Sequence, residues 1–398
     1  MDDDLLLKAY KEELDQEFEG LMNWWRTYSI DEAQGGFFGE VGNNNVGIGQ
    51  SSKGLVLNAR ILWTFSSAFL FKGSGEDLAV ATRAFDYIFL HFYDAENGGF
   101  YWSVSANGEM LDGKKQIYGQ AFAIYGLSAY HEATGDLRAL QLAKETFELI
   151  EKYSYDDVNL GYKEACSRAW RGLSDLRLSE KDLNTEKSMN THLHIIEAYA
   201  SLYQVWENDQ LAMAIRNLLF VFKRHMLTDS SHLSLFFSAR WVPQSSIISY
   251  GHDIEAAWLL QECAEILGDK EEVSLFKMVA INLTHGVKES IDQDGGMFYE
   301  FDPKNDHMVR EKHWWPQAEA MVGFFNAYQL TKDSKYLLKS IASFDFVKAK
   351  LKDREFGEWY WGIDPDGTLM KESKAGFWKC PYHNGRACIE ILKRMGKP

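Results

Sequence analysis

The chain has 398 residues, of which 46% are hydrophobic and 25% are charged, proportions typical of a soluble globular protein. Its formal net charge of −16 repels phosphate groups and anionic lipid, so we expect neither nucleic acid nor a membrane as a partner. The sequence has no signal-peptide pattern, no apolar run of roughly 20 residues, and no CxxC pair among its four cysteines, which predicts a cytoplasmic protein with reduced thiols.

A pattern of glycine followed by alternating aromatic residues recurs six times along the chain. The copies are Gly35–Glu40, Gly98–Val104, Leu160–Ala165, His232–Ala239, Gly295–Asp302 and Gly357–Asp364. The positions taken as equivalent are Phe37, Phe100, Tyr162, Leu233, Met297 and Trp359. The steps between them are 63, 62, 71, 64 and 62 residues, and such a near-constant period indicates a repeat architecture, although the fourth copy has lost its glycine.

An apolar stretch with helical spacing follows each aromatic segment. These stretches are Ala59–Phe69, Ala121–Tyr130, His194–Tyr203, Glu255–Ile266, Ala318–Tyr328 and Gly385–Arg394. After most of them a polar break precedes a second, more amphipathic helix, as at Leu137–Ile150 and Glu272–Ile281, so the first helix of each pair should be the more buried. Six such pairs predict an all-α (α/α)6 barrel with short β-hairpin-like segments at one rim. Because the six prolines are scattered singly and mark no linker, we expect one domain over residues 1–398.

Polar side chains collect just before these inner helices or in their first turns. They are Arg60, Tyr118, Gln120, Asn190, His192, His194, His252, Glu255, Trp315, Gln317, Glu319, His383 and Asn384. Equivalent positions in a ring of parallel helices point toward one mouth of the barrel. Each residue alone has a structural alternative, such as a core ion pair for Arg60, but their repetition at one place in the helices favours a shared site.

Three histidines, His194, His252 and His383, fall at the starts of inner helices. His192 and His194 are two residues apart and face nearly opposite ways on a helix, and the sequence has neither HExxH nor a Cys/His cluster, so we expect no catalytic metal. His252 and Glu255 are three apart and share a helix face, which places a carboxylate where it can orient an imidazole.

Imidazoles suit a reaction that must remove a proton and return one, because their pKa lies near neutral pH. Glycosidic hydrolysis normally needs two carboxylates flanking the bond instead. The sequence has no GxSxG, no P-loop, and no GxGxxG between a strand and a helix, so nucleophilic hydrolase, NTPase and dinucleotide-binding functions lack support.

Four segments carry a resemblance to a known family. They are Lys187–Tyr199 (KSMNTHLHIIEAY), Ser249–Trp258 (SYGHDIEAAW), His313–Phe324 (HWWPQAEAMVGF) and Trp378–Glu390 (WKCPYHNGRACIE). They resemble the N-acylglucosamine 2-epimerase superfamily, most nearly its cellobiose 2-epimerase branch and the sister mannose 2-epimerases, from about Trp24 to the C-terminus. The resemblance implies an (α/α)6 barrel and an isomerase that inverts C2 of a glucose or mannose unit, with a mono- or disaccharide as substrate and no cofactor.

Carried over residue by residue, the resemblance implies that His252 and His383 are a general acid/base pair, with Glu255 beside His252. It places His194 near the ring and anomeric oxygens of the sugar. The residues it implies as further sugar contacts are Arg60, Tyr118, Asn190, Trp315, Trp378 and Glu319. The chain departs from the family pattern at Pro316, which restricts the backbone of Trp315 and puts the pose of that ring in question, and His192 receives no role.

The implied reaction opens the pyranose, removes the C2 proton to give an enediolate stabilised by Arg60 or His194, and returns a proton to the opposite face. An aldose–ketose isomerase is the first alternative, since an enediolate can also be protonated at C1. An inverting glycoside hydrolase on the same barrel is the second, with carboxylates from Asp253, Glu255 and Glu319. A non-catalytic sugar-binding protein leaves the three inner-helix histidines without a purpose.

Overall fold

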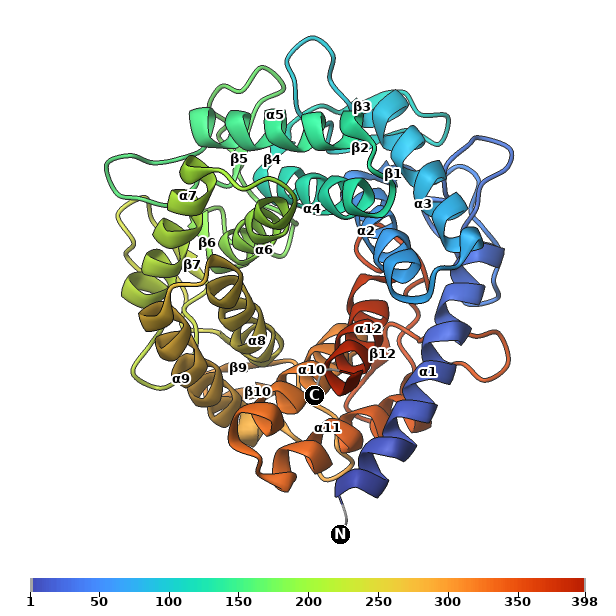
Figure 1. Cartoon of the computed structure of the whole chain (residues 1–398), viewed down its shortest axis with the longest axis vertical. Helices are drawn as coiled ribbons and strands as arrows, with labels where there is room; N and C mark the ends of the chain where they lie inside the picture. Colours follow the sequence, from blue (N-terminus) through green and yellow to red (C-terminus); the bar gives the residue numbers. More distant parts are fainter. Residues whose placement is uncertain (1–2, 397–398) are drawn as a thin grey trace.

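Twelve α-helices form two concentric rings in a computed structural model of the chain, which describes residues 3–396 (Figure 1). The inner ring consists of α2 (Leu55–Lys72), α4 (Ile117–Thr134), α6 (Met189–Val205), α8 (Tyr250–Leu267), α10 (Trp314–Thr331) and α12 (Tyr382–Gly396). The outer ring consists of α1 (Asp3–Tyr28), α3 (Gly75–Tyr87), α5 (Leu137–Tyr153), α7 (Asp209–Val221), α9 (Lys270–Gly286) and α11 (Ser334–Phe346). The predicted (α/α)6 barrel is confirmed.

The inner helices are buried on nearly every side, because each packs against two inner neighbours and an outer partner. In α2 every residue from Leu55 to Ala68 is buried, whereas α5 buries one stripe of its surface. The N-terminal helix α1, which was not among the predicted elements, packs against α12 and so completes the sixth pair. No helix within residues 3–396 combines the length and the apolarity needed to cross a lipid bilayer.

Short antiparallel strands link successive repeats at the end of the barrel where the inner helices begin. The pairs are β1 (Lys53–Gly54) with β2 (Ser103–Val104), β4 (Lys115–Gln116) with β5 (Ala165–Cys166), β6 (Lys187–Ser188) with β7 (Phe236–Phe237), β8 (Ile248–Ser249) with β9 (Glu300–Asp302), and β11 (Lys312–His313) with β12 (Gly362–Ile363). β2 also pairs with β3 (Met110–Asp112), and β9 pairs with β10 (His307–Val309). A bridge between Val41 and Ala375 closes the ring from the last repeat to the first.

The six predicted aromatic segments each make one β-bridge back to the end of the preceding outer helix. The bridges are Ile30–Phe37, Tyr93–Phe100, Tyr155–Tyr162, Leu227–Leu233, Ile291–Met297 and Lys352–Trp359. The six positions taken as equivalent in the sequence are therefore equivalent in space, including Leu233 in the repeat that lost its glycine. In that repeat Ser231 takes the left-handed conformation (φ 62°) that Gly98 and Gly99 take in the second repeat.

A buried lysine paired with an aspartate ties the segment before an inner helix to the turn after an outer helix in five repeats. The pairs are Lys53–Asp31, Lys115–Asp94, Lys187–Asp156, Lys312–Asp292 and Lys374–Asp353, with N–O distances of 2.6–3.0 Å. The fourth repeat has Ile248 and Thr228 at these places. Since a buried charge without a partner is costly, both members are absent together.

Candidate active site

The predicted site residues come together at the strand-bearing end of the inner ring. They are Arg60 on α2, Tyr118 on α4, Asn190 and His194 on α6, His252 and Glu255 on α8, Trp315 and Glu319 on α10, Trp378 just before α12, and His383 on α12. They form two groups in contact through α12, one around His194 and one around His252 and His383. All six inner helices thus contribute to one place.

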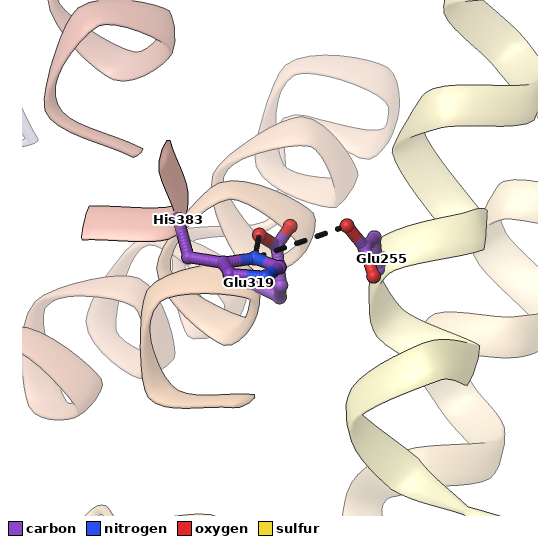
Figure 2. A group of neighbouring side chains, drawn as sticks. All are labelled: Glu255, Glu319 and His383. Atoms are coloured by element: carbon purple, nitrogen blue, oxygen red, sulfur yellow. Dashed lines mark hydrogen bonds and ion pairs between the residues drawn. The ribbon is translucent and has the colours of Figure 1, made fainter. Parts of the chain in front are cut away.

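His383 is held by a carboxylate. Its Nδ1 lies 2.7 Å from Glu319 Oε1 on α10. Glu255 Oε1, on α8, lies 3.9 Å from the same nitrogen (Figure 2). A carboxylate accepts a hydrogen bond from the protonated Nδ1, so Nε2 is the ring nitrogen left to act as a base. Burial, together with the positive charges of Arg60 and Arg386, holds the pKa of His383 well below its usual range.

Arg386, one turn after His383 on α12, joins the carboxylates of the site. Its Nη2 donates to Glu255 Oε1 at 2.6 Å and to Glu319 Oε1 at 2.7 Å, and its Nη1 donates to Glu197 Oε1. The side chain is 1% exposed, so these charge-assisted bonds form away from water and are strong. The guanidinium is therefore the cation that balances the buried acids.

Sequence reasoning missed Arg386 and Glu197. Both follow an inner-helix histidine by three residues, Glu197 after His194 and Arg386 after His383, and Glu255 follows His252 in the same way. The repeated spacing was a usable signal, because residues three apart share a helix face. Only the pair His252 and Glu255 was recognised in the sequence.

Glu255 does not orient His252 as expected. The His252 Nδ1 lies 2.8 Å from Ser249 Oγ, while Glu255 binds Arg386 and faces His383. The expectation failed because a shared helix face brings two side chains near each other without fixing their partners. Burial and the nearby Glu319 carboxylate raise the pKa of Glu255 to about 8, against the opposing effect of Arg386, and burial lowers the pKa of His252 to about 3.

Glu319 was expected to contact the sugar, but both of its oxygens are used within the protein. Oε1 accepts from His383 and Arg386, and Oε2 accepts from the Trp258 indole at 3.0 Å. The carboxylate therefore acts on the imidazole of His383, whose ring nitrogen it orients.

The indole of Trp315 lies against both acid/base candidates, with ring centroids 4.8 Å from His252 and 5.6 Å from His383. Gly251 makes this approach possible, since a Cβ there would lie 2.4 Å from the indole. Pro316 falls in the first turn of α10, where its missing N–H leaves no helical bond unmade. The departure at Pro316 therefore leaves Trp315 in contact with the two histidines.

His194 lies in a second, more enclosed part of the site. Its Nδ1 donates to Glu197 Oε2 at 2.9 Å, and its ring packs 5.0 Å from the Tyr118 ring. Burial lowers the pKa of His194, whereas Arg386 and His194 overcome the effect of burial on Glu197 and lower its pKa to about 2. A neutral imidazole donating to an ionised carboxylate leaves Nε2 free to accept a proton.

Arg60 and Asn190 are the polar groups beside this histidine. Arg60 Nη2 donates to the Tyr118 hydroxyl at 2.7 Å, and Nη1 lies 3.4 Å from the Trp378 carbonyl oxygen. Asn190 Oδ1 is buried and has no hydrogen-bond partner among the described residues. A sugar hydroxyl is a suitable donor to such an oxygen, so the predicted contacts from Arg60, Tyr118, Asn190 and Trp378 stay predictions that the geometry accommodates.

Four of the polar residues at the helix starts point away from the site, and we call them the latch residues. Their side chains accept backbone N–H groups of the aromatic segments, as Gln120 from Phe100 (2.9 Å), His192 from Tyr162 (2.8 Å), Asp253 from Leu233 (2.8 Å) and Gln317 from Met297 (2.7 Å). The expectation that Gln120, His192 and Gln317 face the mouth is therefore wrong. Asn384 likewise donates to Glu358 inside the protein.

Glu255, Glu319 and His383 are the described residues whose ligand atoms gather closely enough for a metal ion, within 4.8 Å of one another. Arg386 Nη2 already binds one oxygen of each carboxylate, and His383 Nδ1 binds Glu319. The guanidinium supplies the positive charge that a divalent cation would bring. The expectation of a metal-free enzyme stays a prediction.

Comparison with known proteins identifies the family of this site. The N-acylglucosamine 2-epimerase (GlcNAc 2-epimerase) family model matches residues 36–387. The chain belongs to this family. A cellobiose 2-epimerase of Bacteroides fragilis is 44% identical over 98% of this chain and 99% of its own. The solved cellobiose 2-epimerase of Bacillus thermoamylovorans matches with a TM-score of 0.92 at 36% identity, over 97% of this chain and all of the other.

A D-mannose isomerase of Marinomonas mediterranea is 24% identical over 96% of this chain and 97% of its own. The relatives therefore include proteins named as epimerases and one named as an isomerase, and all align along almost the whole chain. The family resemblance expected from the four sequence segments is confirmed, as is the expectation that the protein is an isomerase of the carbohydrate epimerase class.

Proposed function

We propose that the protein is a sugar 2-epimerase that inverts C2 of a reducing-end glucose or mannose unit, interconverting cellobiose and glucosyl-mannose. The observation that carries this proposal is the pair of imidazoles from α8 and α12, both in contact with the Trp315 indole. Two proton-transfer groups held close together are what inversion at a carbon next to a carbonyl requires. The 44% identity to a protein named cellobiose 2-epimerase supports a disaccharide as substrate.

Ring opening is the first step that the site supports. The free Nε2 of His194 accepts the proton of the anomeric hydroxyl, because its Nδ1 proton is held by Glu197. As C1=O1 forms and the C1–O5 bond breaks, the same nitrogen returns that proton to O5, which becomes a hydroxyl. Arg60, buried beside Tyr118, places a positive charge where O1 becomes negative in the later enediolate. The open-chain aldehyde then acidifies the proton at C2.

Inversion follows through an enediolate. One of the two imidazoles, His252 or His383, removes the C2 proton, and after rotation about C2–C3 the other returns a proton to the opposite face. Glu319 stabilises the imidazolium that forms at His383, because its negatively charged carboxylate accepts a hydrogen bond from Nδ1–H. The proton balance requires one imidazole to start as the free base and the other as imidazolium. The first gains the proton that leaves C2, the second loses one to C2, and exchange with solvent returns each to its starting state.

The geometry does not favour inverting glycoside hydrolysis. That chemistry needs carboxyl groups about 6.5–9.5 Å apart with room for a water. Glu255 and Glu319 instead share one nitrogen of Arg386, and Asp253 is turned to the backbone of Leu233. All three carboxylates thus bind groups of the protein itself.

Incubation of the protein with cellobiose tests the proposal. We expect glucosyl-mannose as the product, with no release of free glucose, by NMR or anion-exchange chromatography. Formation of glucosyl-fructose as the main product would assign the alternative aldose–ketose isomerase function, in which the same enediolate is protonated at C1. Stoichiometric glucose release would contradict both.

A further inference from the structure

Two serines stand at the same place in neighbouring repeats, as the N-cap residues of α6 and α8. Ser188 caps α6 in the usual way, because its Oγ accepts the backbone N–H of Thr191 at 3.2 Å. Ser249 makes no side-chain cap bond within the part of the chain that the structure describes. Its Oγ lies 2.8 Å from Nδ1 of His252, which occupies the position that Thr191 has in α6.

The hydroxyl of Ser249 thus bonds to the His252 side chain, although an N-cap serine normally bonds to a backbone N–H of the helix. Ser249 is 1% exposed, so its bond to His252 is shielded from water. The imidazole is fixed on its other side by the Trp315 ring, 4.8 Å away. With Nδ1 bound to the serine, Nε2 is the nitrogen of His252 that remains for the sugar.

Ser249 differs in kind from the partners of the other two site histidines. His194 and His383 present Nδ1 to the carboxylates of Glu197 and Glu319. An ionised carboxylate only accepts a hydrogen bond, whereas a hydroxyl donates or accepts. Nδ1 carries its proton both in the neutral ring with a free Nε2 and in the imidazolium, so it donates to the uncharged Ser249 Oγ in both states, without the negative charge that Glu197 and Glu319 supply to the other two histidines.

From this geometry we propose that Ser249 is a positioning residue for His252, holding Nδ1 through both protonation states so that Nε2 stays directed at C2. The proposal rests on the epimerase function above. It assigns to the α8 cap serine a role in proton transfer in place of the helix-capping role that Ser188 has in α6.

Histidine-selective ¹⁵N labelling tests the hydrogen bond without turnover. Ser249→Ala should shift the Nδ1 signal of His252, assigned with His252→Ala, and leave the signals of His194 and His383 in place. Ser249→Thr, which keeps a hydroxyl, should restore the wild-type signal. An unchanged His252 signal in Ser249→Ala overturns the proposal.

Kinetics test the consequence. Ser249→Ala should lower kcat by about tenfold, the size of one neutral hydrogen bond, with KM changed by less than about twofold. Ser249→Thr should recover kcat to within about threefold of wild type. The matched control Ser188→Ala should lower the melting temperature, because it removes an ordinary cap, and keep the wild-type kcat.

Equal kcat values for Ser249→Ala and wild type, or a loss that Ser249→Thr does not rescue, contradict the positioning role. A wild-type protein that leaves cellobiose unchanged overturns the proposed function instead. The NMR comparison still decides the Ser249 assignment in that case, because it needs no substrate.

Discussion

The two ends of the barrel are built from the same six inner helices, but they differ in whether their polar side-chain atoms are paired within the protein. At the strand-bearing end, the Nε2 atoms of His194 and His383 and the Oδ1 atom of Asn190 remain available for a ligand. At the far end a cavity of about 790 Å³ opens between the last turns of the helices. Several of its charged residues are paired with each other, as Arg394 is with Glu262 and Glu390.

From this difference we expect the reaction at the strand-bearing end, although the cavity of about 790 Å³ lies at the far end. The far cavity has acids, bases and aromatic rings, yet no imidazole lines it. A layer consisting of Glu197, Trp258 and Arg386 lines that cavity on one side. On the other side these residues bind His194, Glu319 and Glu255. We therefore expect substitutions to have large effects on turnover at the strand-bearing end, large effects on folding in this layer, and small effects at the far end.

The largest effect should come from the acid/base pair. His383→Ala and His252→Ala should each lower kcat by roughly 10²–10⁴, the usual loss for a positioned proton-transfer group. The double variant should be scarcely slower than either single variant, because the two residues act as a unit. Steady-state rates with cellobiose measure both, and His307→Ala, on an exposed strand at the rim, is the control. Normal turnover by both single variants would show that the mechanism is wrong.

Next in size should be the loss of Arg386. Arg386→Met leaves Glu197, Glu255 and Glu319 buried without their shared cation, and breaking a buried pair in this way costs about 3–5 kcal/mol. Denaturant unfolding measures the change. A variant as stable as the wild type would contradict the role of the guanidinium in balancing the three acids.

Substitution of a latch residue should lower the stability of the protein and leave its turnover nearly unchanged. Gln120→Ala removes the acceptor for the Phe100 N–H and the donor to its carbonyl oxygen, which costs about 1–3 kcal/mol for a buried group left unpaired. The folded fraction should keep kcat within about twofold, because Gln120 faces away from the sugar. A tenfold fall in kcat with an unchanged unfolding midpoint would place Gln120 in the site after all.

The smallest effect should come from the far end. Glu390→Gln removes a partly buried charge 3.5 Å from Arg394 and should change kcat by less than about twofold, whereas the same chemical change at Glu319 should lower it strongly. Rates and melting temperatures of the two variants, measured side by side, sharpen the comparison. Equal losses of kcat would mean that the far end also takes part in catalysis.

The fold was predictable because it repeats. Six copies of one pattern report on the same structure, so the weak fourth copy could be placed by its period, and the bridge at Leu233 confirms that placement. Helix α1 was not predicted, because no aromatic segment precedes it and its partner α12 lies at the other end of the sequence.

The site was predictable as a location, but its internal pairing was not. His192 and His194 are both polar residues in the first turns of α6, yet one binds the Tyr162 backbone and the other binds the Glu197 carboxylate within the site. Spacing separates their directions without telling which direction is the cleft. Arg386 contacts Glu197 across 189 positions of sequence, and no local pattern specifies a bond of that separation.

The most direct test of the central claim is the fate of the C2 proton. Cellobiose converted in D2O should yield glucosyl-mannose that carries deuterium at C2, visible by NMR as loss of the H2 signal, because an imidazole that holds the proton exchanges it with solvent. Epimer that keeps full protium at C2 would contradict proton transfer through His252 and His383, and with it the function proposed for this end of the barrel.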